Sequence, residues 1–366
     1  MALSAALGAV VEVTSGNETL QEVVVEISGR REAALSYPRL VGILSVGDRV
    51  VVNTTAVELG LGTGGKHIVM ARLDAPPAGR EAGHIVKLRY TPWQFSCLSA
   101  EEQASDHHDA LRSLDSIDGM PVVACMLHSM IAGVCAGAKA VRDVRIAYVM
   151  TDGAALPLAL SRLVHDLQQS GLLDSTITCG QAFGGDFEAV NLFSGLIVAR
   201  AAARADIAVV CQGPGNVGTE TRLGFSGLEQ GEVINAASAL GGTAVAVPRI
   251  SFADPRERHR GLSHHTATAL GLAAIARSVL VLPEMDDERM AQVMGSVRAA
   301  GIDSKHEIVV RDGSSGMEEL RRRRVRVESM GRTPDEDPEF FLACCAAGSY
   351  STELLPLRPG KKPNPP

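Results

Sequence analysis

The sequence predicts an α/β protein with a parallel sheet in its larger part and a small β-barrel at its N-terminus. Short apolar runs alternate with helical patterns from residue 120 onward, and short strand-like runs separated by turn residues fill residues 8–75. Hydrophobic residues make up 46% of the 366-residue chain and aromatic residues only 4%, so aliphatic side chains must form the core, as suits strands and helices packed in layers. The length exceeds that of an average domain, and we therefore expect two domains.

The N-terminal part has the pattern of a small β-barrel. Runs such as VVVEIS and DRVVVN are dense in Val and are separated by turn residues, which is typical of several short strands. The segment DAPPAGREAG (74–83) then breaks both periodicities with its Pro and Gly residues. We therefore expect the barrel in residues 1–75 and a second domain in residues 84–350. The end of the chain, residues 356–366, is too rich in Pro and Lys to pack and is expected to be disordered.

The second domain contains eight short runs that are apolar on both faces, as the strands of a covered parallel sheet are. They read PVVACML, RIAYVM, STITCG, DIAVVCQ, TAVAVPRI, SVLVLPE, HEIVVRD and VRVESM. Helical patterns lie between them, such as residues 156–171, which end in Gly171, and residues 286–301, which have an acidic first turn. Strands and helices that alternate in this way form right-handed crossovers. An open, doubly wound, Rossmann-like sheet is favoured, and an eight-fold barrel is the alternative.

Charge and composition exclude some classes of function. The net charge of −7 argues against a general nucleic-acid binder, which needs Lys and Arg to displace the counterions of phosphates. Charged residues interrupt every apolar stretch before it reaches the roughly 20 residues of a membrane span, and no basic region precedes the apolar start, so we expect neither a membrane segment nor a signal peptide. Seven scattered cysteines are typical of a reducing compartment. The expected location is the cytoplasm and the expected partner is a small molecule, whereas the oligomeric state and any cofactor are left open.

Polar and glycine residues concentrate where the predicted strands end. Asp152 follows the second strand, Asp186 lies in the turn after the third, and the stretch GPGNVGTET follows the fourth. Ligands of parallel α/β folds bind at the carboxyl ends of the strands, where loops vary freely and helix N-termini point their N–H groups. We therefore expect Asp152, Asp186, Gly215 and His265 to share one edge of the sheet.

Gly213, Gly215 and Gly218 have the spacing G-x-G-x-x-G. A dinucleotide fingerprint needs a helix directly after its third glycine and an acidic residue about 20 positions later. Here Gly224 and Gly227 delay a regular helix until about Leu228, and the next strand ends in an arginine. A glycine loop that presents amides, together with Thr219, to an anionic group is therefore favoured over a dinucleotide site. A tight turn without a ligand is the alternative.

The stretch SFADPRERHRGLSHHTATAL (251–270) is unusually rich in cationic side chains. Its Arg256 and Arg260, together with Arg249 just before it, are suited to grip a phosphate or carboxylate. Ser263 is expected to cap a helix whose first turn holds His264 and His265, where the helix dipole would lower the pKa of both. A metal site would require His259 to fold back onto them, because adjacent histidines point about 100° apart on a helix. The alternative is a surface loop linked by salt bridges.

Asp152 and Asp186 stand in turns flanked by glycine, where a carboxylate can face a ligand. Either could be a general base or a magnesium ligand. For Asp186 the alternative is structural, because it is well placed to cap a helix that begins FEAVNLF.

Several long motifs resemble those of a bacterial family catalogued only as a domain of unknown function. They include MTDGAALP, AFGGDFEAVN, GPGNVGTET and RISFADPRERHRGLSHHT. The resemblance covers nearly the whole chain. It implies no activity, since that family has no established reaction.

Three hypotheses follow for the function. The first is an enzyme that acts on a small anionic or phosphorylated ligand. In it Gly213, Gly215, Gly218 and Thr219 cradle the anion, Arg249, Arg256 and Arg260 neutralise it, and Asp152, Asp186, His264 and His265 are the candidate catalytic residues. The second is a metal-dependent hydrolase that uses His259, His264, His265 and an aspartate. The third is a non-catalytic sensor of a small ligand, in which the barrel transmits occupancy to a partner protein.

Overall fold

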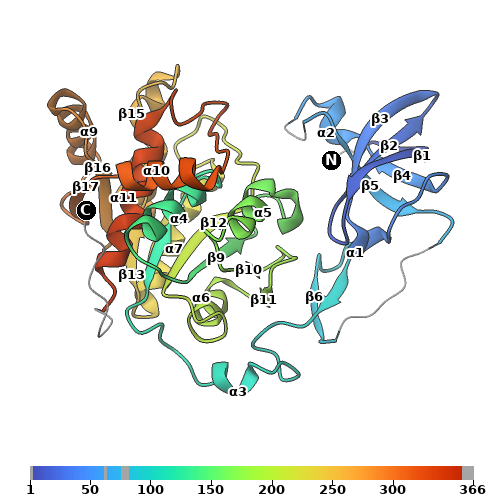
Figure 1. Ribbon diagram of the computed structural model, residues 1–366, viewed down its shortest axis with the longest axis horizontal. Coiled ribbons are helices and arrows are strands. Elements are labelled where there is room, and N and C mark those ends of the chain that lie inside the picture. The colour runs from blue at the N-terminus through green and yellow to red at the C-terminus, as the bar shows by residue number, and fades with distance from the viewer. Residues whose placement is uncertain (1–2, 62–63, 76–81, 357–366) are drawn as a thin grey trace. The chain divides into compact units, whose positions relative to one another are not determined.

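The computed structural model describes residues 3–61, 64–75 and 82–356. By its internal contacts the chain divides into two compact units, Met1–Cys97 and Leu98–Pro366. Figure 1 shows both, with the first unit in blue and cyan.

The first unit contains the predicted β-barrel, which closes in the strand order β1-β2-β3-β5-β4. Its strands are β1 (Ala5–Gly16), β2 (Gln21–Ile27), β3 (Arg30–Ser36), β4 (Arg49–Asn53) and β5 (His67–Arg72). Alternate side chains such as Val23 and Val25 point into the barrel and are buried, which is the period of two expected of strands. The unit also contains the one-turn helices α1 (Pro38–Val41) and α2 (Thr55–Glu58), and ends in the antiparallel pair β6 (Ile85–Lys87) and β7 (Phe95–Cys97).

The second unit is built on an open sheet of eight parallel strands in the order β11-β10-β9-β12-β8-β13-β16-β17. These are β8 (Pro121–Ala124), β9 (Ile146–Thr151), β10 (Ser175–Cys179), β11 (Phe187–Ala189), β12 (Ile207–Gln212), β13 (Thr243–Ala246), β16 (Val279–Pro283) and β17 (Glu307–Arg311). From β8 the sheet extends through β12, β9, β10 and β11 to one edge and through β13, β16 and β17 to the other. The favoured doubly wound sheet is thus confirmed, and the eight-fold barrel is excluded.

Helices cover both faces of this sheet (Figure 1). One face packs against α4 (Met130–Val141), α5 (Arg162–Gln169), α10 (Ser314–Arg323) and α11 (Pro338–Glu353). The other packs against α6 (Leu192–Ala201), α7 (Glu229–Ala239) and α9 (Asp287–Ala299). The helix α3 (His108–Leu111) is a single turn beside α6. Among the described residues, every helix is too short or too polar to cross a membrane.

Two expectations for individual elements are wrong. The eighth predicted strand, VRVESM, pairs with no strand of the sheet: Val325 and Val327 instead pack on the core between sheet and helices, so the alternation of Val and Arg reflects packing without strand pairing. The eighth strand of the sheet is β11, in a segment predicted to be helical. The helix that follows it, α6, begins after Asn191, whose side chain accepts a hydrogen bond from the backbone N–H of Ser194.

Two local signals at helix ends are confirmed, whereas Asp186 does not cap a helix, because β11 follows it. Gly171 follows α5 with a left-handed φ of 70°, and Asp286 caps α9 by accepting a hydrogen bond from the N–H of Arg289. The expected disordered tail, residues 356–366, lies outside the described residues except for Pro356.

Candidate functional site

A pocket of about 150 Å³ lies where the three central strands of the sheet end. The strands β12, β8 and β13 are neighbours, and residues that follow each of them line the pocket: Asn216 after β12, Met126 after β8 and Arg249 after β13. The carboxyl ends of central strands are where open α/β sheets bind ligands. The wall also contains Phe225, Arg256, Arg258, His259, His264 and His265.

The glycines of GPGNVG have mainly structural roles. A Cβ on Gly213 would lie 2.4 Å from the carbonyl oxygen of Ala155, and Gly215 has a φ of 99°, which favours glycine. Only Gly218 of the three lines the pocket. The N–H of Thr219 donates to the carbonyl of Gly224 and is therefore not turned toward a ligand.

As the sequence indicated, the third glycine, Gly218, is not followed directly by a helix. A 3₁₀ turn at Ser226–Leu228 comes first, and α7 begins only at Glu229. The loop before it is held by side chains, because the Asn216 amide donates to the carbonyl of Met126 over 3.3 Å and accepts from the Gln212 amide. This geometry lacks the helix terminus of a dinucleotide fingerprint.

Three histidines gather at one wall of the pocket. The two-residue strands β14 (Ile250–Ser251) and β15 (Gly261–Leu262) pair antiparallel, which turns the chain back and brings His259 beside the start of α8 (His264–Thr268). Ring centroids lie 4.8 Å apart for His259 and His264, 4.8 Å for His259 and His265, and 4.3 Å for His264 and His265. His259 therefore does fold back onto the histidine pair.

Neighbouring groups hold the rings in place. The Ser263 hydroxyl caps α8 as predicted, accepting from the N–H of His265, and also lies 2.7 Å from Nδ1 of His259. The ring of His265 stacks on Phe225 with a centroid distance of 3.8 Å and an angle of 5°. The Nε2 atom of His264 is buried and has no hydrogen-bond partner within the described part of the chain.

All three histidines have a lowered pKa. Burial and then the charges of Arg249 and Arg256 lower the pKa of His259 to about 3. Burial also lowers the pKa of His264, and burial and the charge of His264 lower the pKa of His265 to about 3. The direction agrees with the sequence analysis, but the main cause is burial, and α8 has only five residues. At pH 7 the imidazoles are therefore neutral.

Three arginines line the pocket, and each is paired with a carboxylate. The buried carboxylate of Asp254 accepts from Arg256 and Arg249 over 2.9 and 3.1 Å, and Arg332 reaches the same oxygen at 3.4 Å. Arg258 pairs with Glu220 over 2.9 Å at the exposed rim. Burial lowers the pKa of Arg249 to about 10, so it remains a cation at neutral pH.

The structure brings together some of the candidate residues and not others. Gly218, Arg249, Arg256, His264 and His265 all line the pocket. Arg260 is exposed and is not part of the pocket wall.

The two aspartates occupy different places. Asp152 follows β9 at the expected edge, where its carboxylate accepts from the N–H of Gln181 over 2.9 Å. The structure does not bring Asp186 to this edge. Its carboxylate accepts from the N–H and hydroxyl of Thr176, near the start of β10, over 2.8 and 3.0 Å. It thereby joins the turn before β11 to β10.

Sequence reasoning missed Glu229 at the start of α7. Burial, and to a lesser extent the charges of Glu232 and Asp152, raise its pKa to about 7 in spite of a hydrogen bond with Thr151 that lowers it. A carboxyl group that titrates near neutral pH is typical of functional sites. The sequence offered no signal for it, because the burial depends on the close approach of the 151–153 turn, where a Cβ on Gly153 would lie 2.9 Å from a Glu229 oxygen.

Glu229→Gln is expected to stabilise the protein at high pH. Because the carboxyl pKa is raised in the folded state, the free energy of unfolding falls as the pH rises from about 4.5 to about 7. Above this range the whole loss of stability is present. Since Glu229 is only partly buried, we expect a gain of about 1–2 kcal/mol at pH 8 and none at pH 4. Urea unfolding at both pH values measures it, with Glu318→Gln at an exposed position of α10 as control. An equal gain at both pH values would refute the assignment.

His128 lies at the same edge, after β8, but its ring is engaged inside the protein. Its Nε2 lies 2.7 Å from the hydroxyl of Ser161 and its Nδ1 lies 3.2 Å from that of Tyr148. Burial lowers its pKa to about 4. Since both ring nitrogens have partners, we assign His128 to the support of the strand ends.

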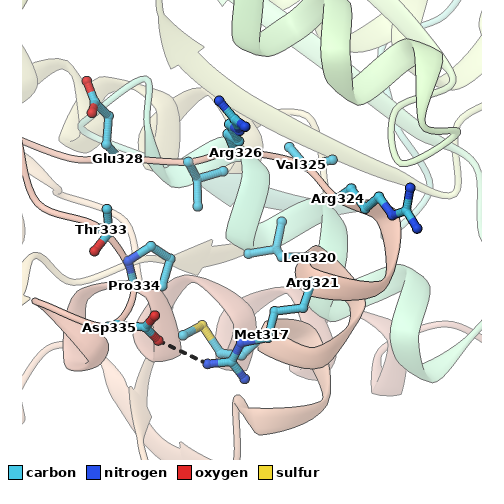
Figure 2. A pocket seen from close by; sticks show the side chains of 11 residues that line it. Met317, Leu320, Arg321, Arg324, Val325, Arg326, Glu328, Thr333, Pro334 and Asp335 are labelled. Carbon is cyan, nitrogen blue, oxygen red and sulfur yellow. Dashed lines mark hydrogen bonds and ion pairs between the residues drawn. The ribbon is translucent and has the colours of Figure 1, made fainter.

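A second pocket of about 610 Å³ lies between α10 and the segment 325–335 (Figure 2). Arg321, Arg324 and Arg326 stand around an apolar floor that includes Met317 and Leu320. Arg321 pairs with Asp335 over 3.3 Å, the contact that is dashed in Figure 2. Its lining contains no histidine or cysteine. The smaller pocket, with its converging histidines and arginines, is therefore the candidate site.

Comparison with known proteins agrees with the resemblance noted in the sequence. The model of one family, described as a protein of unknown function, matches residues 33–348. No protein with a curated description matches the chain.

Proposed function

Because the chain belongs to this family of unknown function, DUF3866, we propose its function from the site alone. The proposed function is that of an enzyme that binds a small anionic ligand, such as a phosphorylated or carboxylated metabolite, in the pocket at the ends of β12, β8 and β13. The observation that carries the proposal is the convergence of Arg249, Arg256 and Arg258 on one pocket wall. Guanidinium groups bind phosphate and carboxylate through paired hydrogen bonds.

The charge balance of the pocket favours an anion. The side chains of Arg256 and Arg258 are 40% and 37% exposed, so part of each guanidinium can reach a ligand. Since the histidines are neutral at pH 7, the arginines supply the positive charge. An enzyme is favoured over a passive sensor because perturbed pKa values concentrated in a cleft are typical of active sites.

A thermal-shift experiment on the full-length protein tests the proposal. Orthophosphate, citrate and an uncharged sugar are each added in excess, and the melting of the second unit is followed. A ligand at 100 times its dissociation constant stabilises by about 2.7 kcal/mol, a shift of roughly 5–10 °C for a domain of this size.

The control uses two arginines of the same segment. Arg258→Gln should reduce the shift caused by the anion, because Arg258 lines the pocket and its ion pair with Glu220 is exposed and contributes little to stability. Arg260→Gln should leave the shift unchanged. The proposal fails if only the uncharged compound raises the melting temperature, or if the two variants respond alike.

A further inference from the structure

We propose that His259, His264 and His265 together bind one transition-metal ion, with Zn²⁺ the ion that fits the three ligands best. This inference goes beyond the proposed anion site and does not depend on it. The nitrogen atoms that could act as ligands, one on each ring, all lie within 4.8 Å of one another.

The separation of the three nitrogens is close to that of a metal centre. Zn–N bonds of about 2.0–2.1 Å in tetrahedral geometry place ligand nitrogens about 3.3 Å apart. The widest separation here would therefore have to close by roughly 1.5 Å when the ion binds. A spacing of five residues between His259 and His264 matches no common metal-binding motif. The three histidines meet only because β14 and β15 pair and turn the chain back.

Two of the rings are oriented in advance. Ser263 holds Nδ1 of His259 at 2.7 Å, and if that nitrogen carries the proton, the lone pair of Nε2 is free for a metal, as in metal sites where a histidine donates its other N–H to a neighbouring oxygen. Phe225 fixes the plane of His265 by stacking. Such support from neighbouring residues is typical of ligands that bind a metal.

The third histidine has an unsatisfied atom at the site. The Nε2 atom of His264 is buried and has no partner in the described part of the chain, and a buried polar atom without a hydrogen bond destabilises the fold. A metal ion bound at this nitrogen would supply the missing partner by accepting its lone pair. The same residue lines the pocket, so the remaining coordination positions of the ion face the space where water or an anionic ligand can bind.

The ligand set decides which class of metal fits. Three imidazoles without a carboxylate suit Zn²⁺ and neighbouring transition metals, whereas Mg²⁺ and Ca²⁺ prefer oxygen. The arginines oppose a cation, but the single carboxylate of Asp254 offsets part of the charge of Arg249, Arg256 and Arg332, and Glu220 offsets that of Arg258. The positive charge that remains favours an anion as the additional ligand of the metal.

Metal titration of the full-length protein tests the inference. Protein without an affinity tag is stripped with a chelator, dialysed, and titrated with CoCl₂ and then ZnCl₂. We expect one equivalent of Co²⁺ per chain, with visible absorption of a four-coordinate ion that Zn²⁺ abolishes. X-ray absorption of the zinc-loaded protein should show three imidazoles. Binding of no stoichiometric metal, or a coordination shell dominated by sulfur or carboxylate, overturns the proposal.

A pair of variants assigns the ligands. His264→Gln should weaken Co²⁺ binding by at least about 10-fold, since even groups that only orient a ligand contribute this much. His165→Gln, an exposed residue of α5, should bind Co²⁺ as the wild type does. Equal affinity of both variants overturns the assignment. The melting temperature of the metal-free protein is also measured with orthophosphate. Metal binding and anion binding are thereby tested separately.

Discussion

Replacing Asp254 with alanine is expected to lower the free energy of unfolding of the second unit by about 3–5 kcal/mol, the usual result of removing one partner from a buried ion pair. The Asp254 side chain is completely buried and accepts hydrogen bonds from Nε and Nη2 of Arg256 over 3.0 and 2.9 Å. It also pairs with Arg249 and Arg332. Without it, three guanidinium groups face one another, and that of Arg249 is nearly buried.

Urea unfolding measures the effect, and Glu220→Gln is the matched control. Glu220 also pairs with an arginine of the pocket, but its side chain is 75% exposed, so we expect a loss below about 1 kcal/mol. If Asp254→Ala costs no more than the control, the buried network does not hold the pocket wall.

The carboxylate of Asp254 is also expected to make the fold sensitive to acid. Burial alone would raise the pKa of Asp254, but the hydrogen bonds and charges of Arg256 and the charge of Arg249 outweigh it and hold the pKa well below its usual value. A depressed folded-state pKa gives stability that is present above the unfolded-state value of about 3.9 and is lost as the pH falls through the folded-state value. Asp254→Asn should therefore flatten the loss of stability below pH 4.

Gly348→Ala in α11 is expected to destabilise the protein by about 1–3 kcal/mol. A Cβ at Gly348 would lie 2.0 Å from the carbonyl oxygen of Val134 in α4, and one at Gly137 in α4 would lie 2.0 Å from the carbonyl oxygen of Cys345 in α11. The two helices lie side by side (Figure 1) and approach through backbone atoms that cannot rotate away. The gain in helix propensity, about 1 kcal/mol, is smaller than this clash.

Gly295→Ala is the matched control because it makes the same chemical change in a helix with open space. A Cβ at Gly295 in α9 would meet nothing within 4 Å, so alanine should stabilise by about 0.5–1 kcal/mol. Opposite signs of the two changes in thermal or urea unfolding are the expected result. Stabilisation by both substitutions would show that α4 and α11 are not packed this closely.

The features that could be predicted from sequence are those set by neighbouring residues. Ser263 could be identified as a helix cap because a cap involves only neighbouring residues. In the structure its hydroxyl accepts from the N–H of His265, two positions away. The core strands were identified because a parallel sheet covered on both faces demands continuous apolar runs. In contrast, β11 was missed because it has only three residues and carries the polar Glu188, and VRVESM shows the periodicity of a strand without pairing as one.

The candidate site was only partly predictable for a related reason. The segment 249–265 and the loop after β12 were identified from residue types, but their geometry depends on the hairpin of β14 and β15, whose strands are too short to show a periodicity. The stacking of His265 on Phe225 joins residues 40 positions apart. Asp186 was placed at the wrong end of its strand because a turn that precedes an edge strand looks like one that precedes a helix.

The most direct test of the central claim, that a small anion binds between the arginines and the histidines, is a crystal structure of the full-length protein soaked in tungstate, a heavy analogue of small oxyanions. We expect an anomalous peak in the pocket within hydrogen-bond distance of the guanidinium of Arg256 or Arg258, which crystals of Arg258→Gln should show at lower occupancy. A pocket that stays without tungstate while the anion binds elsewhere on the second unit would contradict the proposed function.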